Sequence, residues 1–115
     1  MSPIDVLRVL LGAGVDAEIV NTGGGCGAVS VAVPGGCVLV TPSDGPWAVG
    51  VDDGVPVERD VWAVSMWLGD DASWVDALGV RDGDATVPGS GVLGAVRLLD
   101  GLAVAAAGGV DVWEL

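Results

Sequence analysis

The chain has 115 residues, with 16 Asp and Glu against four Arg, and its formal net charge at pH 7 is −12. Lys, His, Phe, Tyr and Gln are all absent. General acid–base catalysis mostly uses His, Lys or Tyr, and binding to phosphates needs cations. This composition therefore argues against most enzyme chemistry and against nucleic-acid binding, and it favours a small acidic protein whose partner is another protein.

A single domain over residues 1–115 is expected from the length, with a core of Val, Leu, Ala and Ile. No segment reaches about 18 consecutive apolar residues, so no membrane span is expected. The first eleven residues lack the basic leader of a signal peptide. We therefore expect a cytoplasmic protein of a bacterial host, in which Cys26 and Cys37 are free thiols.

The first elements are a helix and three strands. Ser2 and Pro3 suit the N-cap and first position of a helix, apolar residues at helical spacing follow, and Gly12–Gly14 ends it. The expected strands are Asp16–Val20, Ala28–Val33 and Cys37–Thr41.

The second and third strands are predicted to pair about a turn at Pro34–Gly36, with Cys37 opposite Val33. Because side chains alternate along a strand, this register predicts which residues share the core face. Those residues are Val29, Val31, Val33, Cys37 and Leu39. The same register does not favour a disulfide between Cys26 and Cys37.

A fourth strand is expected at Trp47–Val51, with Trp47 in the core. A hairpin turn at Asp52–Gly54 then leads into a fifth strand that runs to Leu68. Its later half, Val61–Leu68, is apolar on both faces, so a helix is an alternative there.

The last third is predicted to contain an acidic irregular segment and a second helix. Gly69–Gly89 is expected to be irregular, with a short helical turn at Ala72–Leu78. Val92–Ala107 has helical apolar spacing, and Gly108 follows it. The predicted fold class is α+β, an antiparallel sheet of four to five strands flanked by an N-terminal and a C-terminal helix. The predicted buried residues are Val29, Val31, Leu39, Val49, Leu99 and Leu102.

The segment DAEIVNTGGGCG, residues 16–27, resembles small actinobacteriophage and prophage proteins. In these proteins an N-terminal helix leads to a strand and a TGGGC-like loop, and the resemblance covers Met1–Val40. It implies a phage or prophage source and brings no established activity.

The motifs that carry chemistry elsewhere are incomplete in this chain. The glycine-rich segment Thr22–Gly27 lacks the Lys and the following helix of a phosphate loop, so a hairpin loop is the preferred interpretation. Cys26 has no neighbouring base, and two thiols without His do not make a zinc site. Asp82 and Asp84 do not match a calcium loop. No catalytic, cofactor or metal site is therefore predicted.

The acidic segment between Gly69 and Asp84 is the predicted partner-binding surface, because carboxylates concentrate there with Arg81 as the one cation. Trp67 or Trp74 is the expected anchor, since a large aromatic side chain beside charges is typical of interfaces. The alternative is that Trp74 closes the core. The predicted site residues are Trp67, Asp70, Asp71, Trp74, Asp76, Asp82 and Asp84.

The leading hypothesis is a non-enzymatic phage-type protein that binds, and modulates, a host or phage protein with a basic surface. A second hypothesis is a DNA mimic that inhibits a nucleic-acid-binding enzyme. A third is a structural or accessory subunit of a phage particle, in which the small-residue sheet face packs against a second copy as a homodimer. An enzyme ranks last. No nucleic acid and no membrane is expected among the partners.

Overall fold

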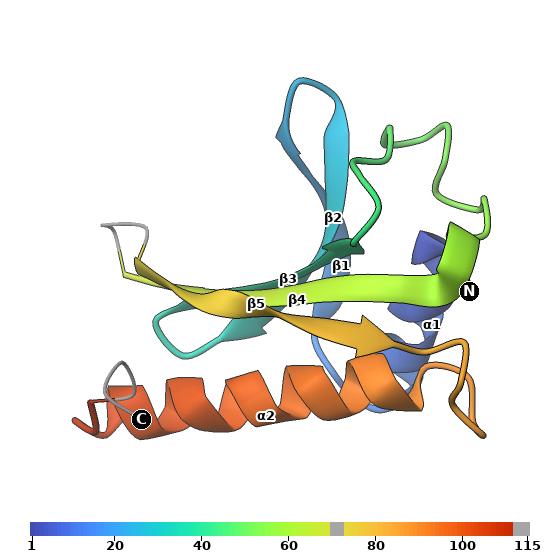
Figure 1. Cartoon of the computed structure of the whole chain (residues 1–115). Helices are drawn as coiled ribbons and strands as arrows, with labels where there is room; N and C mark the ends of the chain where they lie inside the picture. Colours follow the sequence, from blue (N-terminus) through green and yellow to red (C-terminus); the bar gives the residue numbers. More distant parts are fainter. Residues whose placement is uncertain (70–72, 112–115) are drawn as a thin grey trace.

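The computed structural model describes residues 1–69 and 73–111, and of residues 73–77 it describes the backbone alone. Five strands form one antiparallel sheet in the order β1-β2-β3-β4-β5. The predicted α+β class, with an N-terminal and a C-terminal helix around an antiparallel sheet, is confirmed (Figure 1). The elements are α1 (Pro3–Gly12), β1 (Ala17–Gly23), β2 (Cys26–Val33), β3 (Gly36–Pro42), the 3-10 turn η1 (Glu58–Asp60), β4 (Val61–Leu68), β5 (Ser73–Arg81) and α2 (Ser90–Ala107).

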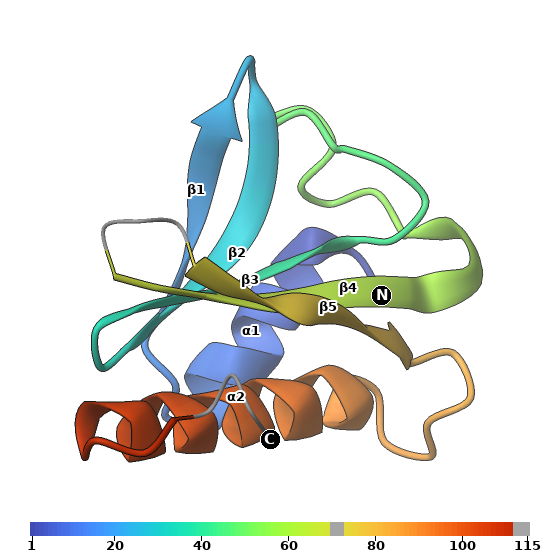
Figure 2. The same cartoon turned by 60° about the vertical axis from the view of Figure 1, so that its left-hand side comes forward.

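Both helices pack on the same face of the sheet, and the outer end of the β1–β2 hairpin rises away from β3–β5 (Figures 1 and 2). The core lies between this face and the helices. Its sheet side chains are Val29, Val31, Val38, Val40, Trp62, Val64 and Met66, and its helical side chains include Val6, Leu10, Val92, Val96 and Leu99. The predicted burial of Val29, Val31, Leu99 and Trp47 is confirmed.

The start of α1 follows directly from its sequence. The Ser2 Oγ accepts the amide of Asp5 at 3.2 Å, and the Asp5 carboxylate accepts the amide of Ser2 at 2.9 Å. These two hydrogen bonds satisfy the amides of Ser2 and Asp5, which have no acceptor within the helix. The backbone hydrogen bond from Ser2, with a smaller effect of its hydroxyl, holds the pKa of Asp5 below its ordinary value. The ionised Asp5 carboxylate therefore stabilises the fold at neutral pH, and this contribution is lost as the pH falls through the lowered pKa.

The predicted register between β2 and β3 is wrong by one residue. Cys37 pairs with Ala32, and Gly36 pairs with Val33, so the turn contains only Pro34 and Gly35. Gly35 has a φ of +80°, which suits the left-handed position of a tight hairpin. A one-residue shift exchanges the two faces of a strand. Val38 and Val40 therefore enter the core, whereas Leu39 is half-buried on the opposite face.

The chain from residue 43 to 57 forms loops, so the predicted strand Trp47–Val51 and the early start of the fifth strand are wrong. Ala48 makes only an isolated bridge, to Cys26. The Asp52 and Asp53 carboxylates accept the backbone amides of Ala48 and Gly50, which diverts these amides from a strand ladder. Val49 is half-buried as a result.

The segment Val61–Leu68 is a strand, and the alternative of a helix there is excluded. The predicted helical turn at Ala72–Leu78 is wrong for its described part, because β5 pairs with β4 from Ser73 to Arg81. β5 forms a strand because its backbone pairs with the edge of β4. Local apolar spacing alone does not predict such pairing between strands.

Among the described residues, α2 is the one helix that is long and apolar enough, by length and composition, to cross a membrane. Its inner stripe is part of the core, and the buried side chains are Val92, Ala95, Val96, Leu99 and Ala103. Leu102, which was predicted to be buried, is half-buried and packs against the core from its margin.

Candidate binding site

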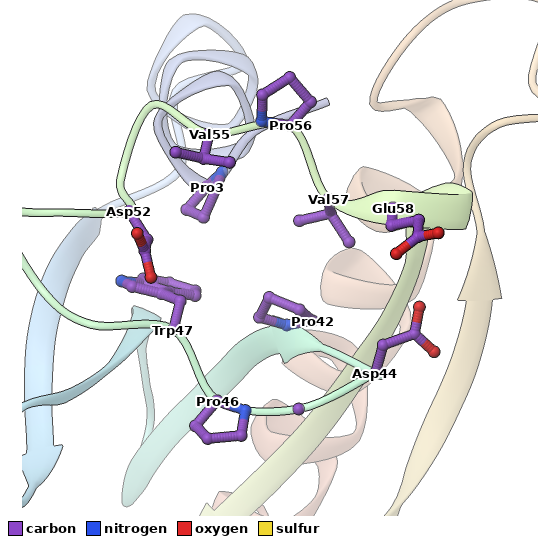
Figure 3. A pocket seen from close by; sticks show the side chains of 11 residues that line it. Pro3, Pro42, Asp44, Pro46, Trp47, Asp52, Val55, Pro56, Val57 and Glu58 are labelled. Carbon is purple, nitrogen blue, oxygen red and sulfur yellow. The ribbon is translucent and has the colours of Figure 1, made fainter.

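A pocket of about 270 Å³ opens between the segments 42–47 and 52–58, beside the first turn of α1 (Figure 3). Four of the chain's six prolines line this pocket, namely Pro3, Pro42, Pro46 and Pro56. Proline fixes its own φ and so gives the walls a defined shape. The remaining lining residues are Asp44, Gly45, Trp47, Asp52, Val55, Val57 and Glu58.

Backbone hydrogen bonds tie this loop region to the start of α1. The amide of Ile4 donates to the carbonyl oxygen of Asp53, and the amide of Val57 donates to the carbonyl oxygen of Met1, both at 2.8 Å. The Asp53 carboxylate also accepts the Trp47 indole N–H at 3.1 Å. These bonds fix both walls of the pocket against the helix.

Trp47 is held from the other side by Gly27 of β2. The Gly27 amide donates to the Trp47 carbonyl oxygen at 3.0 Å, and the indole lies directly over the Gly27 Cα. A Cβ at residue 27 would overlap the indole and would lie 2.7 Å from Val49 Cγ2. The glycine-rich segment therefore has a structural role, since Gly24 and Gly25 form the predicted hairpin turn and Gly27 leaves room for Trp47.

The loop region ends at Asp60, which connects three parts of the chain. One carboxylate oxygen accepts the Trp62 indole N–H at 2.8 Å, and the other lies 3.0 Å from the Met1 amino nitrogen. Arg59 and Asp60 have φ values of 66° and 51°, a conformation that is costly for residues other than glycine. The contacts of Asp60 hold this strained turn beside the pocket residue Glu58.

The carboxylates of the pocket lie at its two ends. Asp44 and Glu58 are exposed, and in the described part of the chain their carboxylates have no hydrogen bond or ion pair. Figure 3 shows these two carboxylates facing each other at one end, with Asp52 at the other end beside Trp47. Asp52 already accepts the amide of Ala48 at 3.3 Å. The pocket thus has apolar walls and, at one end, two exposed carboxylates that no cation of the described residues neutralises.

The predicted site residues are not assembled in this pocket. Trp67 lies half-buried on the sheet face away from the helices, and its indole N–H donates to Ser65 Oγ at 3.2 Å. Trp74 occupies the register position opposite Trp67 on β5, and Asp76 lies on the same strand, but their side chains are outside the described residues. Asp70 and Asp71 lie outside the described residues altogether.

Asp84 and Asp82 differ sharply in environment. Asp84 is exposed and lies 3.9 Å from Arg81. Asp82 is only 3% exposed, and its two oxygens accept the amides of Gly91 and Val92 at 3.2 and 3.1 Å. It caps α2, whose own N-cap residue is Gly89 and offers no side-chain acceptor. Asp82 is therefore committed to the fold and is not a free charge that steers a partner.

Replacing Asp82 by alanine is expected to lower the free energy of unfolding by about 1–3 kcal/mol, because two amides at the start of α2 lose their acceptor. Asp84→Ala is the matched control, and it should change stability by less than about 0.5 kcal/mol, since exposed ion pairs contribute little. Urea denaturation followed by circular dichroism measures both values. Equal midpoints for the two variants would show that Asp82 is not the cap.

Sequence reasoning missed Asp44, Asp52 and Glu58 as candidate site residues. The sequence does contain a signal for this site, because Pro42, Pro46 and Pro56 lie close to two Asp-Gly pairs. It marks an irregular segment with a rigid backbone, which is where binding residues are often placed. Among the described residues, no group of three or more His, Cys, Asp or Glu is placed to hold a metal ion.

Comparisons with protein-family models, with curated proteins and with solved structures found no match to this chain. The candidate function consequently depends on the chemistry of the pocket and on the charge of the surface around it.

Proposed function

We propose that this protein is a non-enzymatic binding protein that acts on a bacteriophage or host protein with a basic surface, and that the pocket is its anchor. The observation that carries the proposal is the combination of apolar walls with the carboxylates of Asp44 and Glu58 at one end, which form no ion pair within the described residues. Such a pocket offers an apolar contact and a counter-charge to the same side chain of a partner.

The overall charge supports the same class of partner. A net charge of −12 creates a negative field that attracts basic surfaces and speeds their encounter. Within the described residues, Asp5 and Asp84 are paired with arginine and Asp60 with the Met1 amino group. Among the described residues, the exposed carboxylates without an ion pair or hydrogen bond are those of Asp16, Glu18, Asp44, Glu58 and Asp100. Two of these five line the pocket, which gives the attraction of a cationic partner a defined position.

Charge reversal at the pocket tests the proposal. The double variant Asp44→Lys/Glu58→Lys should lose a partner that the wild-type protein captures from a lysate of an actinobacterial host. Glu18→Lys/Asp100→Lys is the control, because both positions are exposed, lie far from the pocket in the chain, and change the net charge equally. The control should retain most of the capture at physiological salt, where a Debye length of about 8 Å screens distant charges.

The result that would contradict the proposal is equal capture by all three proteins. Equal loss in both variants would show that the overall field acts without the pocket. Competition with duplex DNA for the captured partner distinguishes a DNA mimic, because only a partner that binds DNA through the same surface would be released by it.

A further inference from the structure

We infer that the pocket receives a single arginine side chain of the partner, with the guanidinium between Asp44 and Glu58 and the aliphatic stem along the proline walls. This inference rests on the proposed function and names the group that the pocket recognises. It is carried by the size of the pocket, by its charged end and by the chemistry of its walls.

The size of the pocket suits a single side chain. At about 270 Å³ it is smaller than the usual range for cofactor and drug-sized sites, which begins near 300 Å³. One extended side chain fits within this volume. The lining residues come from the loop segments 42–47 and 52–58, which lie on opposite sides of this space (Figure 3).

The charged end favours a guanidinium over an ammonium group. Two carboxylates that face each other present several acceptor oxygens on opposite sides of one space. A guanidinium has five N–H donors in a planar fork and can bind two carboxylates along two of its edges. An ammonium group has three donors and is more strongly hydrated, so it gains less from this arrangement.

The walls between the two ends suit the stem of the same side chain. Pro42 and Val57 lie between the Asp44–Glu58 end and the Trp47–Asp52 end in Figure 3. The methylene groups of arginine pack on apolar surfaces while the charged head stays at the mouth. Because Asp52 already accepts the amide of Ala48, the guanidinium is assigned to the opposite end, where the two carboxylates have no partner among the described residues.

Three peptides test the assignment. Acetylated and amidated hexa-arginine, hexa-lysine and hexa-citrulline are titrated into the protein by calorimetry; citrulline keeps the shape of arginine without its charge. Hexa-arginine should bind about tenfold more tightly than hexa-lysine, which corresponds to about 1.4 kcal/mol. Hexa-citrulline should not bind measurably, because its side chain supplies no counter-charge.

Two neutralised variants locate the contact. Asp44→Asn/Glu58→Gln should weaken hexa-arginine binding about tenfold, as expected from the loss of charge-assisted hydrogen bonds. Glu18→Gln/Asp100→Asn removes the same number of charges and should weaken it by less than about threefold, through the field alone. All four positions are exposed. Equal melting temperatures will confirm that the variants are folded.

The outcomes separate this inference from the proposed function. If hexa-lysine binds as tightly as hexa-arginine and the pocket variant weakens both, the arginine assignment is wrong and the basic-partner proposal stands. If both variants weaken hexa-arginine equally, the peptide does not occupy the pocket and the inference is overturned. If neither cationic peptide binds, both the inference and the proposed function are overturned.

Discussion

Replacing Leu99 by alanine is expected to lower the free energy of unfolding by about 2–5 kcal/mol. Leu99 is 1% exposed and lies on the inner stripe of α2, where the helix packs on the sheet. The substitution removes its contacts and leaves a cavity that the surrounding valines fill only in part, since β-branched side chains are stiff.

The neighbouring residue supplies the control for this prediction. Leu98 has the same side chain on the same helix but is 58% exposed. Leu98→Ala should change the free energy of unfolding by no more than about 0.5 kcal/mol. Urea denaturation of both variants measures the difference. Similar losses at positions 98 and 99 would mean that α2 does not pack on the sheet with the described face.

Replacing Gly27 by alanine is expected to displace Trp47 and to destabilise the protein by about 1–3 kcal/mol, as overpacking in a core does. The new Cβ would overlap the Trp47 indole, which is 5% exposed and hydrogen-bonded to Asp53. Trp47 is also a wall of the pocket, so binding of a cationic peptide should weaken together with stability.

Gly94→Ala is the control, because residue 94 lies in α2 and a Cβ there meets no atom within 4 Å. Alanine is the better helix former, so this variant should gain about 0.5–1 kcal/mol. Calorimetric unfolding gives the sign of each change. A Gly27→Ala protein that is as stable as the wild type would contradict the close packing of Trp47 on β2.

The parts of the fold that sequence reasoning predicted correctly are those fixed by local signals. Ser2, Pro3 and the apolar spacing defined α1, and similar spacing defined α2. The arrangement of an antiparallel sheet between an N-terminal and a C-terminal helix, and the antiparallel pairing of β2 with β3, also followed from short-range patterns. The register did not, because Pro34–Gly36 is compatible with a two-residue and a three-residue turn, and the difference exchanges the faces of Cys37 and Val38.

The candidate site could not be predicted from the sequence, for a different physical reason. Its walls meet only after residues 3, 42–47 and 52–58 come together in space. The capping role of Asp82 likewise depends on amides nine and ten residues further along the chain. A run of carboxylates in the sequence therefore did not distinguish the buried Asp82 from the exposed Asp84, although only the latter can face a partner.

The most direct test of the arginine pocket is a two-dimensional ¹H–¹⁵N spectrum recorded while hexa-arginine is added. The account predicts that the largest shift changes occur at the amides of Gly45, Val55, Val57 and Glu58 and at the Trp47 indole N–H. The amides of α2, which contributes no residue to the pocket, should change little. Changes spread evenly over the acidic surface, or concentrated away from the pocket, would contradict it.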